Sequence, residues 1–152
     1  MNIFFMGTPE FAVPTLDILN KNYNVIGVFT QPPRPSGRGM KEIKSSIQQY
    51  SEKNKLNFYT PNNLKNDEIL KLLKSLNPDL IVVVAYGLLI PEVILKIPLY
   101  GCINGHASLL PKWRGAAPIQ RAIEAGDIKT GCTSMLMEKG LDTGPMIHKK
   151  EM

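Results

Sequence analysis

Two polar side chains that lie two residues apart, Asn104 and His106, have types and spacing that could do chemistry. They lie at the end of a short run, residues 101–104, that predicts a strand. Side chains at positions i and i+2 of a strand project to the same side, about 7 Å apart. An asparagine amide can donate to a developing oxyanion, and histidine titrates near neutral pH. The pair therefore indicates a site that stabilises negative charge and moves a proton, although such a pair alone is more often structural.

Two further blocks of sequence give this pair a chemical meaning. Residues 108–115 read SLLPKWRG, and Asp142 lies in the glycine-flanked loop GLDTG at residues 140–144. With Asn104 and His106 they resemble the formyltransferases that use 10-formyltetrahydrofolate, whose mark is N-x-H, then SLLPxxRG, then a downstream aspartate. Single members of this set carry little information, but the blocks in this order are highly specific.

The resemblance extends over nearly the whole chain. Residues 6–16 read MGTPEFAVPTL, residues 30–39 read TQPPRPSGRG, and residues 113–123 read WRGAAPIQRAI. Within the formyltransferases these blocks resemble the family of methionyl-tRNA formyltransferases. That family implies 10-formyltetrahydrofolate as formyl donor, initiator methionyl-tRNA as acceptor, and no metal.

The resemblance also assigns roles to individual positions. It implies that Asn104 and a protonated His106 stabilise the oxyanion and that Asp142 orients the transfer of a proton. It implies that residues 87–90 line the pterin end of the donor site. Two further sets follow by position: the folate site is completed by Ser108, Leu109, Leu110 and Pro111, and the acceptor stem of tRNA is contacted by Arg34, Arg38 and Lys41.

The sequence departs from the family between the two central residues of the site. This family usually has an apolar branched residue there, and this chain has Gly105. A side chain at this position would point away from the site into the core, so Asn104 and His106 can keep their places. A strand glycine costs about 0.5–1 kcal/mol of stability relative to alanine, so we expect a working but less rigid site.

Short apolar runs alternate with amphipathic stretches, a pattern typical of an α/β domain with helices on both faces of a mostly parallel sheet. Together with the resemblance, it predicts a Rossmann-like formyltransferase fold. An antiparallel hairpin is expected near the C-terminus, and a helix capped by Thr8 is expected after the first strand. The expected strands are residues 3–6, 25–30, 80–85, 101–104, 130–138 and 146–150; the expected helices are 9–19, 42–53, 67–76, 91–96 and 118–126, with an irregular loop at 31–40.

Length and composition are those of one globular domain. The chain has 152 residues, of which 43% are hydrophobic and 20% charged, and its formal net charge is +5. The cations are mostly scattered lysines, which favours a solvated surface over a concentrated anion-binding face. Cys102 and Cys132 lack metal-ligand spacing and predict buried free thiols. The N-terminus lacks the features of a signal peptide, and no apolar run is long enough for a membrane helix.

These observations predict a cytoplasmic, monomeric enzyme without a membrane segment. The resemblance implies that residues 1–152 form the catalytic domain, incomplete at its C-terminal end, without the second, tRNA-binding domain of the family. Two alternatives stay open. One keeps the chemistry but formylates an amino sugar or a small ribosyl amine, and the other is a non-catalytic folate- or RNA-binding fragment.

Overall fold

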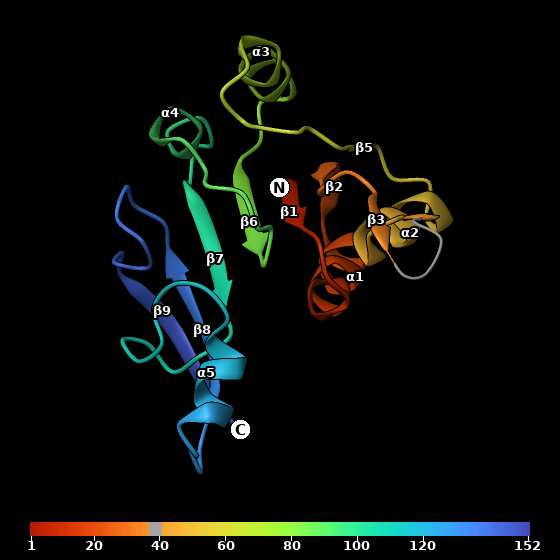
Figure 1. Ribbon diagram of the computed structural model, residues 1–152. Helices are drawn as coiled ribbons and strands as arrows, with labels where there is room; N and C mark the ends of the chain where they lie inside the picture. Colours follow the sequence, from red (N-terminus) through yellow and green to blue (C-terminus); the bar gives the residue numbers. More distant parts are fainter. Residues whose placement is uncertain (37–40) are drawn as a thin grey trace.

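A seven-stranded sheet organises the protein in this computed structural model, which describes residues 1–36 and 41–152 (Figure 1). The strand order is β5-β2-β1-β6-β7-β8-β9, with parallel pairing from β5 to β7 and antiparallel pairing from β7 to β9. The strands are β1 (Asn2–Gly7), β2 (Asn24–Phe29), β5 (Phe58–Tyr59), β6 (Leu80–Val84), β7 (Cys102–His106), β8 (Gly131–Leu136) and β9 (Met146–Glu151). The prediction of a mostly parallel sheet with a C-terminal antiparallel hairpin is confirmed.

Helices cover both faces of the sheet. Helices α1 (Val13–Asn22) and α2 (Ser46–Lys53) lie on one face, and α3 (Asp67–Leu76) and α4 (Glu92–Leu95) lie on the other (Figure 1). A 3-10 turn, η1 (Glu10–Ala12), precedes α1, and α5 (Pro118–Glu124) lies between β7 and β8 in the chain. Within the part of the chain that the structure describes, no helix has the length and apolar character to cross a membrane.

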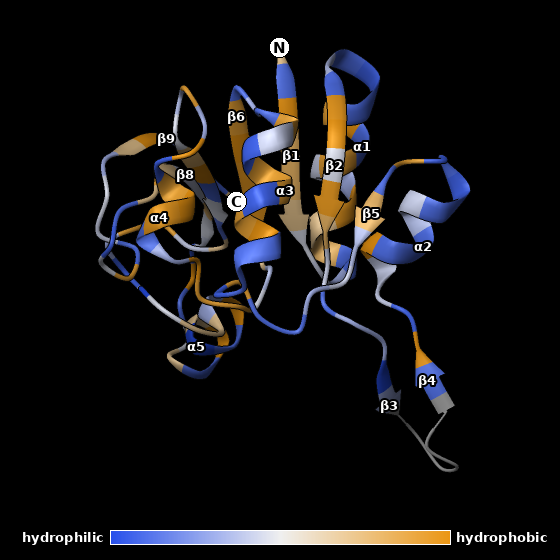
Figure 2. Ribbon diagram, turned by 90° about the horizontal axis from the view of Figure 1, so that it is seen from above, coloured by the Kyte–Doolittle hydropathy of each residue, from blue (hydrophilic) through white to orange (hydrophobic). Residues whose placement is uncertain are grey.

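The central strands β1 and β6 are buried on both faces because their side chains alternate between two apolar clusters. Phe4 and Met6 pack with α3 and α4, whereas Ile3 and Phe5 pack with α1 and α2. All five residues of β6 are buried. Figure 2 shows β1, β2 and β6 as largely apolar segments at the centre of the molecule. This double burial explains why these strands read as near-continuous apolar runs in the sequence.

A small antiparallel ribbon projects from the body of the protein (Figure 2). It consists of β3 (Arg34–Ser36) and β4 (Lys41–Ile43), with Arg34 opposite Ile43. The prediction of an irregular loop over residues 31–40 is therefore wrong for residues 34–36. Pro35 is compatible with this strand because a two-stranded ribbon has open edges that need no donor.

Hydrogen bonds at two helix starts also differ from the predictions. The expected helix 42–53 begins only at Ser46, because Ser45 caps it by accepting from Gln48 N at 2.9 Å, and residues 42 and 43 lie in β4. Thr8 caps no helix; its hydroxyl instead donates to the Tyr86 carbonyl at 2.7 Å. The predicted helix after β1 thus splits into η1 and α1.

Candidate active site

A cavity of about 660 Å³ opens at the carboxyl ends of β6 and β7, where parallel α/β sheets place their ligands. Its walls come from the turn after β6, the end of β7, the start of α5 and the loop between β8 and β9. The lining residues that the site uses are Gly87, Leu88, Asn104, His106, Gly115 and Asp142.

Strand β7 brings Asn104 and His106 to the lining of this cavity. Asn104 pairs with Val83 of β6 on one side and with Met135 of β8 on the other, so its backbone is held between two strands. His106, at the end of β7, is opposite Thr133 and is only 7% exposed. The strand pairing therefore fixes the backbone from which both side chains line the cavity.

Asp142 reaches the same place from the loop between β8 and β9. Its backbone is left-handed, with φ of 51°, a conformation that aspartate tolerates better than most residues. Its Oδ2 accepts from the Gly115 backbone N–H at 2.8 Å, and its Oδ1 accepts from Asn104 Nδ2 at 3.3 Å. The carboxylate is therefore fixed by two donors, and one of them is a predicted site residue.

The two ring nitrogens of His106 have different environments. Nε2 lies 2.8 Å from the Trp113 carbonyl, and Nδ1 lies 3.7 Å from Asp142 Oδ2. Because a carbonyl oxygen only accepts, Nε2 must carry a hydrogen and donate it. Nδ1, the other ring nitrogen, faces the Asp142 carboxylate.

The segment after β7 is anchored by Asp127. The Asp127 carboxylate accepts from Trp113 Nε1 at 2.7 Å and pairs with Lys112 Nζ. The hydrogen bond from Lys112, followed by that from Trp113, lowers the pKa of Asp127 below its ordinary value. At neutral pH this carboxylate is charged, and it holds the indole of Trp113, the residue whose backbone carbonyl contacts His106.

The structure does not bring residues 108–111 to the wall of the cavity. Ser108 is fully buried and donates to the Lys112 carbonyl at 2.6 Å. Thr133 Oγ1 donates to the Ser108 carbonyl at 2.7 Å and accepts from Leu110 N at 3.1 Å. These contacts make the segment a support for the end of β7, and its predicted contact with folate stays a prediction.

Residues 87–90, in contrast, line the cavity, and their contact with the pterin end of the donor stays a prediction. They follow Tyr86, whose side chain is 2% exposed and packs in the apolar cluster beside α3 and α4. Burial raises the pKa of the Tyr86 hydroxyl above its ordinary value. The turn that carries residues 87–90 is therefore anchored in the hydrophobic core by Tyr86.

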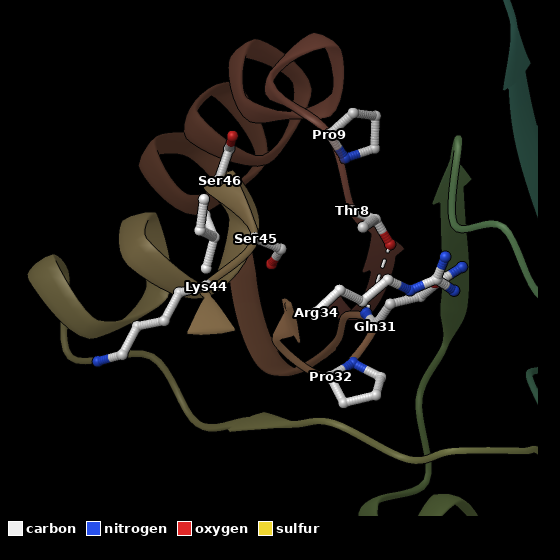
Figure 3. Close-up of a pocket in the computed structure, with 9 residues that line it drawn as sticks. Thr8, Pro9, Gln31, Pro32, Arg34, Lys44, Ser45 and Ser46 are labelled. Carbon is white, nitrogen blue, oxygen red and sulfur yellow. Dashed lines mark hydrogen bonds between the residues drawn. The ribbon is translucent and has the colours of Figure 1, made fainter. Parts of the chain in front are cut away.

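Arg34 and Lys41, two of the three predicted tRNA-contacting residues, are absent from the lining of the cavity that holds Asn104, His106 and Asp142. Arg34 opens β3 and lines a second, smaller cavity of about 320 Å³ (Figure 3). Lys41 opens β4, and Arg38 lies outside the described residues. Their contacts with tRNA stay predictions.

Gly105 faces away from the site, in agreement with the expectation from strand alternation. A Cβ built at Gly105 would lie 3.3 Å from Val84 Cγ2, and Val84 belongs to the cluster beside α1 and α2. Asn104 and His106 are therefore not displaced by the glycine itself.

Sequence reasoning missed the backbone partners of the site. The Gly115 amide and the Trp113 carbonyl fix Asp142 and His106. Both lie in the KWRG block, where Trp113 and Gly115 have positive φ values of 60° and 89°. The block was recognised as a motif, but side-chain chemistry gives no signal for a backbone donor or acceptor. Among the residues that the structure places, no group of three His, Cys, Asp or Glu side chains could hold a metal ion.

Comparisons with known proteins show the family of this chain. The model of the formyl transferase family matches residues 1–152. A methionyl-tRNA formyltransferase of Pseudomonas entomophila is 55% identical over 150 residues, which are 98% of this chain and 48% of that protein. One of Pseudomonas putida is 53% identical with the same coverage. The chain thus spans about half the length of the curated relatives it matches.

Solved structures show the same fold at low sequence identity. A phosphoribosylglycinamide formyltransferase from Bacillus halodurans has a TM-score of 0.80 at 21% identity, covering 100% of this chain and 79% of that one. The enzyme of the same name from Streptococcus pneumoniae has a TM-score of 0.78 at 18% identity, covering 99% and 80%. The arrangement of the sheet, the cavity at its carboxyl edge and the match over the whole sequence lead to one conclusion: this chain belongs to the formyl transferase family.

Proposed function

We propose that this chain carries the catalytic site of an enzyme that transfers a formyl group from 10-formyltetrahydrofolate to the amino group of initiator methionyl-tRNA in the cytoplasm. The convergence of Asn104, His106 and Asp142 on one cavity carries the proposal. The names of the relatives that are 53–55% identical support the acceptor. In this proposal residues 1–152 make up most of the catalytic domain.

The cavity suits a donor that is flat and largely apolar at one end. Its volume of about 660 Å³ falls in the range of small-molecule sites. Leu88, Leu89 and Ile90 supply apolar wall, and backbone groups of the same turn are available to a ring with polar edges. The polar triad lies on another wall, so the formyl group would be the part of the donor that meets Asn104 and His106.

Asn104 is suited to stabilise the charge that develops in the reaction. Attack of the acceptor amine on the formyl carbon converts the formyl oxygen into an oxyanion. Asn104 Nδ2 carries two hydrogens, and Asp142 Oδ1 takes one of them, so the second can be donated to that oxygen. Loss of one such donor typically lowers kcat about 100- to 1000-fold.

His106 and Asp142 are suited to move the proton. As the new N–C bond forms and the bond from the formyl carbon to N10 breaks, the amine loses a proton and N10 gains one. Nδ1 of His106 lies 3.7 Å from Asp142 Oδ2, so this nitrogen and the carboxylate are placed to relay the proton. No group of the chain needs to bond covalently to the formyl carbon.

The acceptor would approach from the ribbon of β3 and β4. Arg34 and Lys41 lie on this ribbon, and arginine forks suit phosphate groups. Arg38→Ala is expected to weaken the use of tRNA and to leave folate affinity unchanged, and equal loss of both would count against a tRNA role for this segment.

A transfer assay tests the proposal. The chain is incubated with 10-formyltetrahydrofolate and, in parallel, methionyl-tRNA, an amino-sugar nucleotide or phosphoribosylglycinamide. We expect formyl transfer to methionyl-tRNA, and loss of it in His106→Gln without loss of the fold by circular dichroism. Transfer only to a small amine would replace the acceptor with that amine. Binding of the folate without any transfer would instead identify a folate-binding module.

A further inference from the structure

The carbonyl of Tyr86 joins the ends of three neighbouring strands. It accepts from Thr8 Oγ1, after β1, at 2.7 Å and from Gln31 Nε2, after β2, at 3.0 Å. Tyr86 itself follows β6 and leads into residues 87–90, the wall of the large cavity. The place of this wall therefore depends on a side chain that follows β2, which lies two strands from β6 in the sheet.

Gln31 also packs directly against the wall. It is only 8% exposed. Gly87 has φ of +85°, and a Cβ at this position would overlap Gln31 Nε2. The absence of a side chain at Gly87 is thus what allows Gln31 to reach the Tyr86 carbonyl, and any shift of Gln31 acts on the backbone at Gly87.

The other end of the Gln31 side chain holds Arg34. Gln31 Oε1 accepts from Arg34 Nη2. In Figure 3 the two side chains run side by side, away from Ser45 and Ser46. Arg34 starts the projecting ribbon and does not line the large cavity. A continuous chain of contacts therefore runs from the ribbon through Gln31 to the cavity wall.

We infer that Gln31 is a positioning residue that couples the Arg34 end of the ribbon to the wall of the formyl-donor cavity. A ligand that engages Arg34 then changes the affinity for the donor, and by linkage the donor changes the affinity at Arg34 by the same factor. This inference rests on the proposed function only in taking the large cavity as the donor site.

A double-mutant cycle tests the coupling. The affinity for 10-formyltetrahydrofolate is measured by calorimetry without an acceptor. Arg34→Met is expected to weaken it about 2- to 10-fold, the range of one lost hydrogen bond, although Arg34 does not touch the cavity. Gln31→Leu is expected to weaken it at least as much, and the double variant no further than Gln31→Leu alone.

Two other variants separate coupling from general damage. Lys44 also lines the small cavity, but its Nζ pairs with Glu52 at 2.9 Å and points away from Gln31 (Figure 3). Lys44→Met should leave donor affinity unchanged. Gln31→Glu keeps the acceptor for Arg34 but loses the donor to Tyr86, so it should weaken donor binding as Gln31→Leu does. The Thr8 hydroxyl still satisfies the Tyr86 carbonyl in both Gln31 variants, so both should fold, as checked by thermal unfolding.

The outcomes distinguish this inference from the proposed function. Three results would overturn the coupling: unchanged donor affinity in Arg34→Met, additive losses of affinity in the double variant, or an equal loss of affinity in Lys44→Met. In each case, donor binding by the unaltered chain would still support the proposed function. If the unaltered chain binds no 10-formyltetrahydrofolate, the proposed function fails and the coupling fails with it.

Discussion

Replacing Gly105 with alanine should stabilise the protein, because the added methyl group enters the core side of β7. The backbone at Gly105 is not in the left-handed region, and the nearest atom to the new Cβ is Val84 Cγ2 at 3.3 Å. That contact is tight, but it meets the end of a side chain that can shift by a few tenths of an ångström. The next atom, the Val83 carbonyl oxygen, is 4.0 Å away.

The expected gain follows from the removal of a strand glycine. Alanine loses less backbone freedom on folding, which contributes about 0.5–1 kcal/mol. For a chain of 152 residues, this is a rise in Tm of roughly 1–4 °C. Thermal and urea unfolding of Gly105→Ala and the unaltered chain measure it. Because Asn104 and His106 face the opposite side of the strand, the rate of formyl transfer should not fall.

Gly27→Ala is a matched control with the opposite expected sign. Gly27 lies in β2 of the same sheet, but a Cβ there would lie 2.5 Å from Cε2 of the fully buried Phe4. Overpacking of this kind costs about 1–3 kcal/mol. A loss of 1 kcal/mol or more in Gly105→Ala, or equal effects of the two substitutions, would refute the reasoning that the space beside Val84 can accept a methyl group.

Two further predictions concern the site and the thiols. Asp142→Asn replaces one carboxylate oxygen with an amide nitrogen, so the side chain can accept from Gly115 N or from Asn104 Nδ2 but not from both. The kcat should then fall about 100-fold or more with little change in Tm. A kcat within tenfold of that of the unaltered chain would contradict the role of Asp142. Burial raises the pKa of the Cys102 thiol to about 12 and also raises that of Cys132, so at pH 8 an aromatic disulfide reagent should modify Cys102 only after unfolding and Cys132 slowly. The structure buries Cys102 but leaves Cys132 only half-buried, so the prediction of two buried thiols is wrong for Cys132. The thiols of the unfolded chain lose their protons near pH 9, below those of the folded chain, so stability should decrease as pH rises above 9. Rapid modification of Cys102 in the folded chain would refute its burial.

The fold was predictable where burial or periodicity leaves a strong pattern. The apolar run at β6 and the amphipathic helix Asp67–Leu76 were predicted within one residue of their bounds. Errors occur where a single hydrogen bond decides the boundary, as at Ser45. The two-residue strand β5 has no periodicity of its own and exists because it pairs with β2.

The site was predictable as a set of residues and not as a geometry. The sequence identified Asn104, His106 and Asp142, which the structure brings together, because their types form a recognisable motif. It could not show that Nε2 of His106 is occupied by a backbone carbonyl. It also could not show that Thr133 of β8 hydrogen-bonds to Ser108 and Leu110, and the folate contact of residues 108–111 stays a prediction.

The hydrogen bond from Gly115 to Asp142 joins residues 27 positions apart. It closes a ring of chain that contains α5 and β8, with the carboxylate and the amide at the point of closure. Transient opening of the ring would release the carboxylate from its place and expose the Gly115 amide to solvent in the same event. The hydrogen-exchange rate of this one amide therefore reports how often the site comes apart, and a bound ligand that contacts both sides of the ring should slow it.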